Sequence, residues 1–152
     1  LGDREENLRR AADSLVTAGI HILKRSSIYE TEPRDVTDQP WFLNAAVECE
    51  TSLFPMQLLR ATQRVERAGG RTKEGRRAKG PREIDIDILL YGSTIISTPE
   101  LSIPHPRMLE RRFVLDPLVE IAPDLKLPNS PLALREHLKR LQGQITQLVK
   151  PF

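Results

Sequence analysis

Hydrophobic residues recur along the chain with two different periods. Apolar residues three and four positions apart predict one helix over residues 3–18 and a second over residues 55–69. Asp3 would cap the first helix, Pro55 would open the second, and a glycine follows each of them. The buried stripes would consist of Leu8, Ala11, Ala12, Leu15 and Val16 in the first helix and of Leu58, Ala61, Thr62, Val65 and Ala68 in the second.

Alternation of apolar and polar residues predicts the strands. Residues 20–29 are rich in β-branched side chains, and residues 42–51 alternate strictly enough to define a buried face. Residues 84–88 alternate as well, and residues 94–97 would pair with them as a hairpin. The face of residues 42–51 that we expect to be buried carries Leu43, Ala45, Val47 and Cys49. Further helices are expected at 108–112, at 115–121 and after Ser130-Pro131, whereas residues 142–152 show no clear pattern.

The order of these elements indicates the fold. The elements follow in the order helix, strand, strand, helix, strand and strand. With one more strand before Leu1, this order would give the α+β ferredoxin-like plait, with an added C-terminal hairpin and helices. We therefore expect residues 1–152 to form a single domain from which the N-terminal strand of the plait is missing. We also expect a native extension of roughly ten residues before Leu1, about one strand and its turn.

The alternation in residues 84–88 separates isoleucines from aspartates. A strand would place Ile84, Ile86 and Ile88 on one face and Asp85 and Asp87 on the other. Carboxylates about 6.6 Å apart along a strand can converge on one hard cation or on a pair of cations. Taken alone, the two aspartates are equally compatible with a surface strand whose outer face is acidic.

The residues before this acidic segment favour the first interpretation. Residues 71–82 contain six cations and one acid, a net charge of +5, so the rest of a chain with a net charge of +2 sums to −3. Cations that lead into paired carboxylates suggest a polyphosphate bridged to the carboxylates by Mg²⁺. The cations are Arg71, Lys73, Arg76, Arg77, Lys79 and Arg82.

Composition narrows the classes of protein further. With 39% hydrophobic and 29% charged residues, the chain fits a globular protein, and no apolar run approaches the ~20 residues of a membrane span. The charged start does not resemble a signal peptide, so we expect a cytoplasmic protein without a membrane partner. The single cysteine, Cys49, excludes an internal disulfide and a cysteine-based zinc cluster and is expected in the core. Basic residues gathered in one segment favour a small anionic ligand over a nucleic acid.

Six segments in series make the sequence resemble the 6-hydroxymethyl-7,8-dihydropterin pyrophosphokinase family of folate biosynthesis. They cover nearly the whole chain, and together they are far more specific than any one of them. The resemblance implies Mg²⁺-dependent transfer of pyrophosphate from ATP to the hydroxymethyl oxygen of the pterin, which releases AMP. The segments are Ser27–Thr31, Gln39–Ala46, Thr62–Glu66, Gly80–Ile88, Ile103–Met108 and Phe113–Leu118.

The resemblance also implies a role for individual residues. Asp85 and Asp87 would hold two Mg²⁺ ions, and Arg82 and Arg71 would act with them in catalysis, the basic loop closing over the site. The residues expected to bind ATP are Gln63, Glu66, Arg77, Ile88, His105 and Arg111. The residues expected to bind the pterin are Thr31, Pro33, Phe42, Asn44 and Phe113, with the ring stacked between the two phenylalanines. Where relatives often carry a tryptophan before Gly-Pro-Arg, this chain has Lys79.

Three other functions remain open at the level of the sequence. Plait folds often bind RNA on their sheet, so an RNA-binding module without catalysis is the first alternative. The second is an interaction domain, which would leave the acidic segment and the basic loop without a purpose. The third is another metal-dependent nucleotidyl enzyme, and its reaction products would distinguish it. For Phe42 and Phe113, ordinary packing in the core is the alternative to a ring-binding role.

Overall fold

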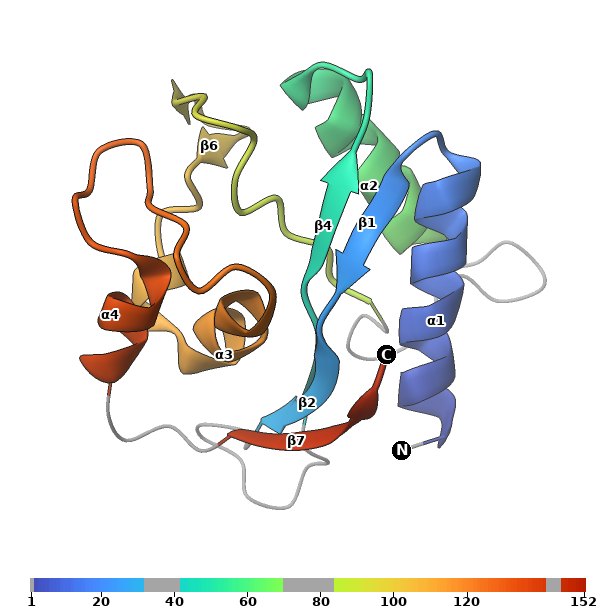
Figure 1. Cartoon of the computed structure of the whole chain (residues 1–152). Helices are drawn as coiled ribbons and strands as arrows, with labels where there is room; N and C mark the ends of the chain where they lie inside the picture. The colour runs from blue at the N-terminus through green and yellow to red at the C-terminus, as the bar shows by residue number, and fades with distance from the viewer. Residues whose placement is uncertain (1, 32–41, 70–83, 142–145) are drawn as a thin grey trace. The chain divides into compact units, whose positions relative to one another are not determined.

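The computed structural model describes residues 2–31, 42–69, 84–141 and 146–152 (Figure 1). Its chain divides into two compact units, each built from two segments of sequence. Unit 1 consists of Leu1–Ile22 and Cys49–Ile88, and unit 2 consists of Leu23–Glu48 and Leu89–Phe152. Helices and small antiparallel sheets make this an α+β protein, as the sequence predicted. Among the described residues, no helix has both the length and the apolar character needed to cross a membrane.

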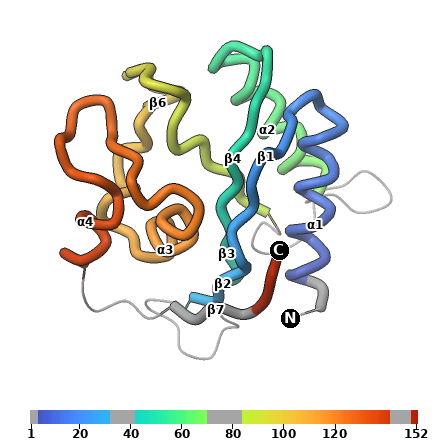
Figure 2. Tube along the Cα trace, viewed as in Figure 1, coloured from blue at the N-terminus to red at the C-terminus, as the bar shows by residue number. Residues whose placement is uncertain are grey.

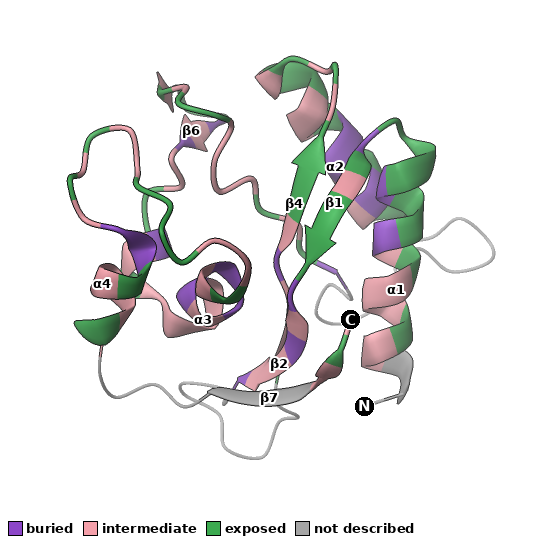
Figure 3. Ribbon diagram, viewed as in Figure 1, coloured by how far each residue is buried: buried purple, intermediate pink, exposed green. Residues whose placement is uncertain are grey.

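Unit 1 is built on two helices, α1 (Gly2–Thr17) and α2 (Pro55–Gly69), which pack against each other. Each helix has exposed residues on one side and more buried residues on the other, as the amphipathic spacing predicted (Figure 3). Apolar side chains from both helices and from the segments that flank them form one cluster. The cluster consists of Leu15, Ile20, Ala61 and Val65, with Ala11, Leu53, Leu58 and Ile86 packed against it.

The details of the two helices differ from the prediction at three positions. Helix α1 begins at Gly2, so Asp3 lies in its first turn instead of capping it, and Glu6 pairs with Arg10 at 2.9 Å. Val16 and Ala68, which were expected in the buried stripes, are exposed. Each is the next-to-last residue of its helix.

Both long strands predicted from the sequence are broken in two. Residues 20–29 contain β1 (His21–Arg25) and the start of β2 (Ser27–Thr31), and residues 42–51 contain β3 (Phe42–Asn44) and β4 (Val47–Glu50). Strand β1 pairs with β4, and β2 pairs with β3. The two breaks therefore fall opposite each other, at Ser26 on one side and at Ala45-Ala46 on the other.

Hydrogen bonds of Ser26 account for these breaks. The Ser26 backbone N–H donates to the Ala46 carbonyl at 2.8 Å, and the Ala46 N–H donates back to Ser26 Oγ at 2.8 Å. Ser26 Oγ in turn donates to the Ser27 carbonyl at 2.7 Å. Because the hydroxyl replaces a backbone partner, the ladder is interrupted while these buried polar groups stay satisfied. The break also changes which residues are buried: Ala46 is buried, whereas Cys49, expected in the core, is exposed.

Unit 2 is built on an antiparallel sheet with the order β3-β2-β7. The pairing register places Tyr29 opposite Asn44 and Thr31 opposite Phe42. Strand β7 (Thr146–Pro151) runs along the other edge of β2 (Figure 1). Figure 2 traces how β1 leads into β2 and how β3 leads into β4. Strand β7 was not predicted, because residues 142–152 show no clear pattern in the sequence.

Two helices and a short turn complete unit 2. Helix α3 (Arg112–Ile121) packs against β2 and against α4 (Leu134–Lys139), and the 3-10 turn η1 (Met108–Glu110) precedes α3. Ala133 occupies the cap position of α4, so the expected cap at Ser130-Pro131 is wrong by two to three residues. The core cluster of this unit consists of Ala46, Met108, Leu115, Leu118 and Leu134.

The predicted strand at residues 84–88 is not present as a strand. These residues have no regular secondary structure, and the predicted partner segment instead contributes β5 (Ile96–Ser97), which pairs with β6 (Ser102–Ile103). The alternation nevertheless separates two sides: Ile84 is buried, Ile86 and Ile88 are half-buried, and the two aspartates between them are exposed. The segment therefore keeps the predicted sides without the predicted ladder.

Candidate active site

The structure describes eleven of the predicted site residues, and they belong to both units. Arg71, Arg77, Arg82 and Pro33 lie outside the described residues, so the predicted basic loop does too. Unit 1 carries Gln63, Glu66, Asp85, Asp87 and Ile88. Unit 2 carries Thr31, Phe42, Asn44, His105, Arg111 and Phe113.

In unit 1, the acidic segment is held by a side chain of helix α2. The backbone N–H of Ile86, which lies between the two aspartates, donates to Glu66 Oε2 at 2.8 Å. This bond explains why the segment is ordered without a strand partner in the described residues, since the carboxylate takes the place of a ladder acceptor. Glu66 was predicted to contact ATP; its observed bond to Ile86 is a contact that the sequence did not predict.

The paired aspartates have the chemistry of a magnesium site. Asp85 and Asp87 are both exposed, so their carboxylates are accessible to a ligand from solvent. Mg²⁺ prefers oxygen ligands and is usually held by one or two carboxylates together with phosphates of the substrate and water. Among the described residues, no group of three or more histidine, cysteine or acidic side chains could hold a metal.

Gln63 lies on the same helix as Glu66, one turn earlier. Its Oε1 accepts a hydrogen bond from Arg60 Nη1 at 3.2 Å, and its side chain is half-buried. The structure thus places two predicted ATP contacts, Gln63 and Glu66, in the unit that carries the acidic segment. Their roles toward ATP stay predictions.

In unit 2, the strands β2 and β3 bring three of the predicted pterin contacts together. Asn44 Nδ2 donates to Thr31 Oγ1 at 3.0 Å, and Phe42 lies opposite Thr31 in the strand register. Thr31 is buried, whereas 55% of the surface of Phe42 is exposed. That exposure excludes the core-packing alternative for Phe42, because a ring that served the core would be covered.

Phe113 and Arg111 lie at the start of helix α3 in the same unit. The Arg111 guanidinium lies 5.5 Å from the centroid of the half-buried Phe113 ring, a cation–π distance. His105, the other predicted ATP contact of this unit, accepts at Nδ1 from the Arg107 backbone N–H at 3.3 Å. In the sequence, His105 lies before η1 and Arg111 directly follows it.

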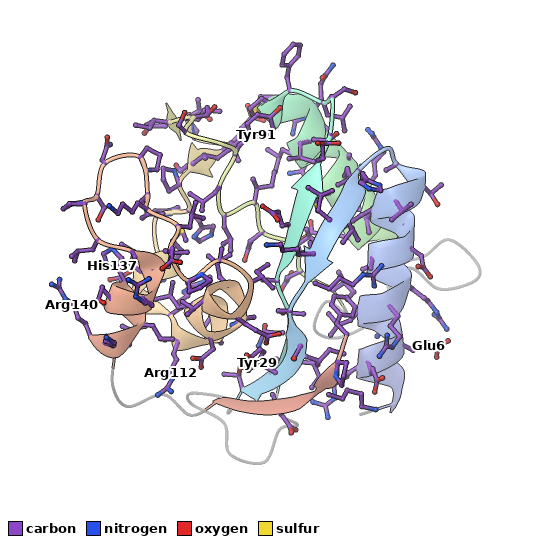
Figure 4. All side chains as sticks on the ribbon, in the orientation of Figure 1. Glu6, Tyr29, Tyr91, Arg112, His137 and Arg140 are labelled. Carbon is purple, nitrogen blue, oxygen red and sulfur yellow. The ribbon has the colours of Figure 1, made fainter. Side chains whose placement is uncertain are left out.

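A carboxylate that the sequence did not predict connects α3 to β2. Glu120 Oε1 accepts from the Tyr29 hydroxyl at 2.6 Å, and Oε2 accepts from the Ser27 N–H at 2.9 Å and from Ser27 Oγ at 3.1 Å. Burial raises the pKa of Tyr29, and the hydrogen bond and negative charge of Glu120 raise it further, with a smaller contribution from Asp116. Figure 4 shows Tyr29 on β2 and Arg112, which bonds Asp116 at 3.1 Å, on α3.

A signal for this contact was present in the sequence. Ser27 and Tyr29 are two residues apart and so share a strand face, and Asp116 and Glu120 are four apart and so share a helix face. Nothing in the sequence alone shows that these two faces meet.

Comparison with known proteins identifies the family. The sequence model described as 7,8-dihydro-6-hydroxymethylpterin-pyrophosphokinase matches residues 1–123. The chain therefore belongs to this family, as the six segments predicted.

Individual relatives agree with this membership. A 2-amino-4-hydroxy-6-hydroxymethyldihydropteridine pyrophosphokinase of Bacillus subtilis is 52% identical over 80% of this chain and 72% of its own length. The folic acid synthesis protein fol1 of Pneumocystis carinii is 42% identical over the whole chain, which spans 20% of that protein. A mitochondrial folate synthesis bifunctional protein of Pisum sativum is 47% identical over 80% of this chain and 23% of its own length. The chain thus spans about a fifth of the fungal relative and less than a quarter of the plant one.

Proposed function

We propose that this chain transfers pyrophosphate from ATP to the hydroxymethyl group of 6-hydroxymethyl-7,8-dihydropterin, giving AMP, and that the reaction depends on Mg²⁺. The observation that carries the proposal is the exposed pair Asp85 and Asp87 in a chain of this family. The relatives whose printed names state pyrophosphokinase activity or folate synthesis support the same reaction.

In this proposal, unit 1 carries the metal ligands and three of the described ATP contacts, and unit 2 carries the other two, His105 and Arg111. Asp85 and Asp87 would be the Mg²⁺ ligands, and two ions are expected. Bound Mg²⁺ would neutralise the negative charge of the triphosphate and orient its oxygens. Glu66 keeps the acidic segment in place through the Ile86 N–H, so that the two carboxylates face solvent together. Arg82, Arg71 and Arg77 would neutralise the remaining charge of the phosphates.

Unit 2 would bind the pterin. A flat fused ring can stack on the exposed Phe42 ring and on Phe113, and such stacking contributes about 0.5–1.5 kcal/mol beyond area burial. Asn44 would recognise the polar edge of the ring. Because its Nδ2 donates to Thr31 Oγ1, the amide has one defined orientation, with Oδ1 left to accept from a ligand N–H.

Two finer features belong to the same proposal. The ferredoxin-like plait is the expected arrangement of the whole domain. The cytoplasm is the expected compartment, whereas two plant relatives carry the word mitochondrial in their names.

Product analysis tests the proposed reaction. The purified chain is incubated with MgATP, with and without 6-hydroxymethyl-7,8-dihydropterin, and the nucleotides are separated. We expect AMP in equimolar amount with the pyrophosphorylated pterin, only when the pterin is present, and no product after Mg²⁺ is removed by a chelator. ADP would indicate phosphoryl transfer and free pyrophosphate would indicate nucleotidyl transfer, and either result would contradict the proposal.

The RNA-binding alternative has one observation in its favour, the exposed aromatic side chain of Phe42 on β3. Titration of a labelled single-stranded RNA at about 150 mM salt separates the two functions. We expect no binding at micromolar protein and a measurable affinity for the pterin under the same conditions. Tight RNA binding that is lost in Phe42→Ala, without pterin binding, would favour the alternative.

A further inference from the structure

We propose that Glu120 is a positioning residue for the pterin-binding surface of unit 2: it fixes helix α3 on strand β2 and thereby sets the place of Phe113. The inference rests on the proposed function, since it concerns the surface assigned to the pterin. The resemblance to the family implies no role for Glu120, and we do not expect its side chain to touch either substrate.

The first step of the argument is the geometry of the carboxylate. Both oxygens of Glu120 are used, one by the Tyr29 hydroxyl at 2.6 Å and the other by the backbone and side chain of Ser27 at 2.9 and 3.1 Å. Hydrogen bonds to a charged acceptor are shorter and roughly twice as strong as neutral ones. Three donors from one strand therefore fix the rotation of α3 and its position along β2.

The second step is the position of the predicted pterin contacts on the same two elements. Strand β2 begins at Ser27 and ends at Thr31, which holds Asn44 by a hydrogen bond of 3.0 Å. Helix α3 carries Phe113 seven residues before Glu120, about two helical turns along the axis. A slide of α3 along β2 would therefore move the Phe113 ring relative to the Thr31–Asn44 pair.

The third step is what the Glu120 contact adds to the apolar packing. Leu115 and Leu118 bury the inner side of α3 in the core of unit 2. The hydrophobic contribution of this burial is non-directional, although close packing resists large shifts through the shape of the side chains. The directional contacts between Glu120 and β2 add a defined position of α3 along the strand.

Substitutions at both ends of the contact test the inference. Glu120→Ala removes all three bonds, Glu120→Gln keeps the shape but has one acceptor oxygen and an NH2 donor in place of the second oxygen, and Tyr29→Phe removes one bond. Glu136→Gln is the matched control, because Glu136 lies in the same unit and pairs with Arg135 and Lys139 of its own helix. Affinity for the pterin and affinity for a non-hydrolysable MgATP analogue are measured separately, together with the melting temperature and AMP formation.

We expect Glu120→Ala to raise the pterin Kd by about tenfold or more, as the loss of hydrogen bonds to a charged group would. Glu120→Gln and Tyr29→Phe should raise it by smaller factors. The Kd of the MgATP analogue should rise by a smaller factor than the pterin Kd, because Arg111 is a predicted ATP contact that adjoins α3, and the control should match the wild type in both affinities. A purely stabilising role would lower the melting temperature and leave the pterin Kd of the folded protein unchanged.

The outcomes separate this inference from the proposed function. If the wild type forms AMP but the folded Glu120 and Tyr29 variants bind pterin normally, the inference is wrong and the function stands. Equal weakening of both ligands would also overturn it. If Glu120→Ala does not fold, the two conservative variants decide. If the wild type neither binds pterin nor forms AMP, the proposed function fails, and the positioning role fails with it.

Discussion

The two units hold their candidate site residues in different ways. In unit 1, Asp85 and Asp87 stand exposed on a segment without regular secondary structure, held through the Ile86 N–H by Glu66. In unit 2, Thr31 and Asn44 stand on paired strands and are bonded to each other. In the proposed site, two carboxylates suffice on the protein side, because water and substrate phosphates complete the coordination of Mg²⁺. A ring-binding surface depends on fixed geometry, because stacking requires defined ring positions.

The largest expected effect concerns the carboxylates of unit 1. Asp85→Asn and Asp87→Ala should each lower AMP formation by roughly a hundredfold or more, since loss of a metal ligand costs several kcal/mol in the transition state. The melting temperature should change little, because both side chains are exposed. Activity and thermal unfolding are measured on the same preparations.

Asp13→Asn is the matched control for these variants, since Asp13 is an exposed aspartate of α1 in the same unit. It should keep wild-type activity. Near-normal AMP formation by either acidic-segment variant would show that the metal assignment is wrong and that the difference between the two units has another basis.

The second effect concerns the hydrogen bonds that break the long strands. Ser26→Ala leaves the Ala46 N–H without its acceptor at a buried position, where Ser26 is only 1% exposed. An unsatisfied buried donor costs about 1–3 kcal/mol, so the free energy of unfolding should fall by that amount. Urea denaturation measures it. The control is Ser14→Ala, at an exposed helical position, which should change the free energy of unfolding by less than about 0.5 kcal/mol. An equally small change in Ser26→Ala would contradict the role of the Ser26 hydroxyl.

The third effect concerns the contact that holds the acidic segment. Glu66→Ala removes the acceptor of the Ile86 N–H, and a hydrogen bond to a charged group contributes about 1.5–3 kcal/mol. Hydrogen exchange at the Ile86 amide should therefore accelerate by roughly ten- to a hundredfold. Exchange at the Tyr29 amide of unit 2 should stay the same. Unchanged exchange at Ile86 would show that the segment is held by its isoleucines alone.

These contrasts explain what the sequence could and could not predict. Periodicity predicted the helices of unit 1 and the two sides of residues 84–88, because both depend on local alternation. It failed at Ser26, where one hydroxyl forms bonds across twenty residues of sequence and breaks two strands. It also failed at β7, which is defined by its pairing with β2 more than by its own pattern.

The candidate site shows the same division. Asp85 and Asp87 were predicted from charge and alternation, whereas Thr31, Asn44 and the phenylalanines were predicted only through the resemblance to the family. The residues that hold these groups, Glu66 toward Ile86 and Glu120 toward β2, were not predicted in those roles, because long-range contacts are not encoded in any local period.

The smallest expected effect is a pH dependence that belongs to unit 2. Burial and Glu120 raise the pKa of Tyr29 above the value near 10 of an exposed tyrosine. Above about pH 10 the unfolded chain loses this proton while the folded protein keeps it, so the stabilising contribution of Tyr29 is complete below pH 10 and declines as the pH rises.

Lysines titrate in the same range, so the comparison is made between the wild type and Tyr29→Phe at about pH 8.5 and pH 10.5 by urea denaturation. The stability advantage of the wild type should shrink at the higher pH. Tyr91→Phe serves as the control from outside the β2–α3 contact, and an advantage over Tyr29→Phe that is equal at both pH values would show that Glu120 does not perturb the phenol.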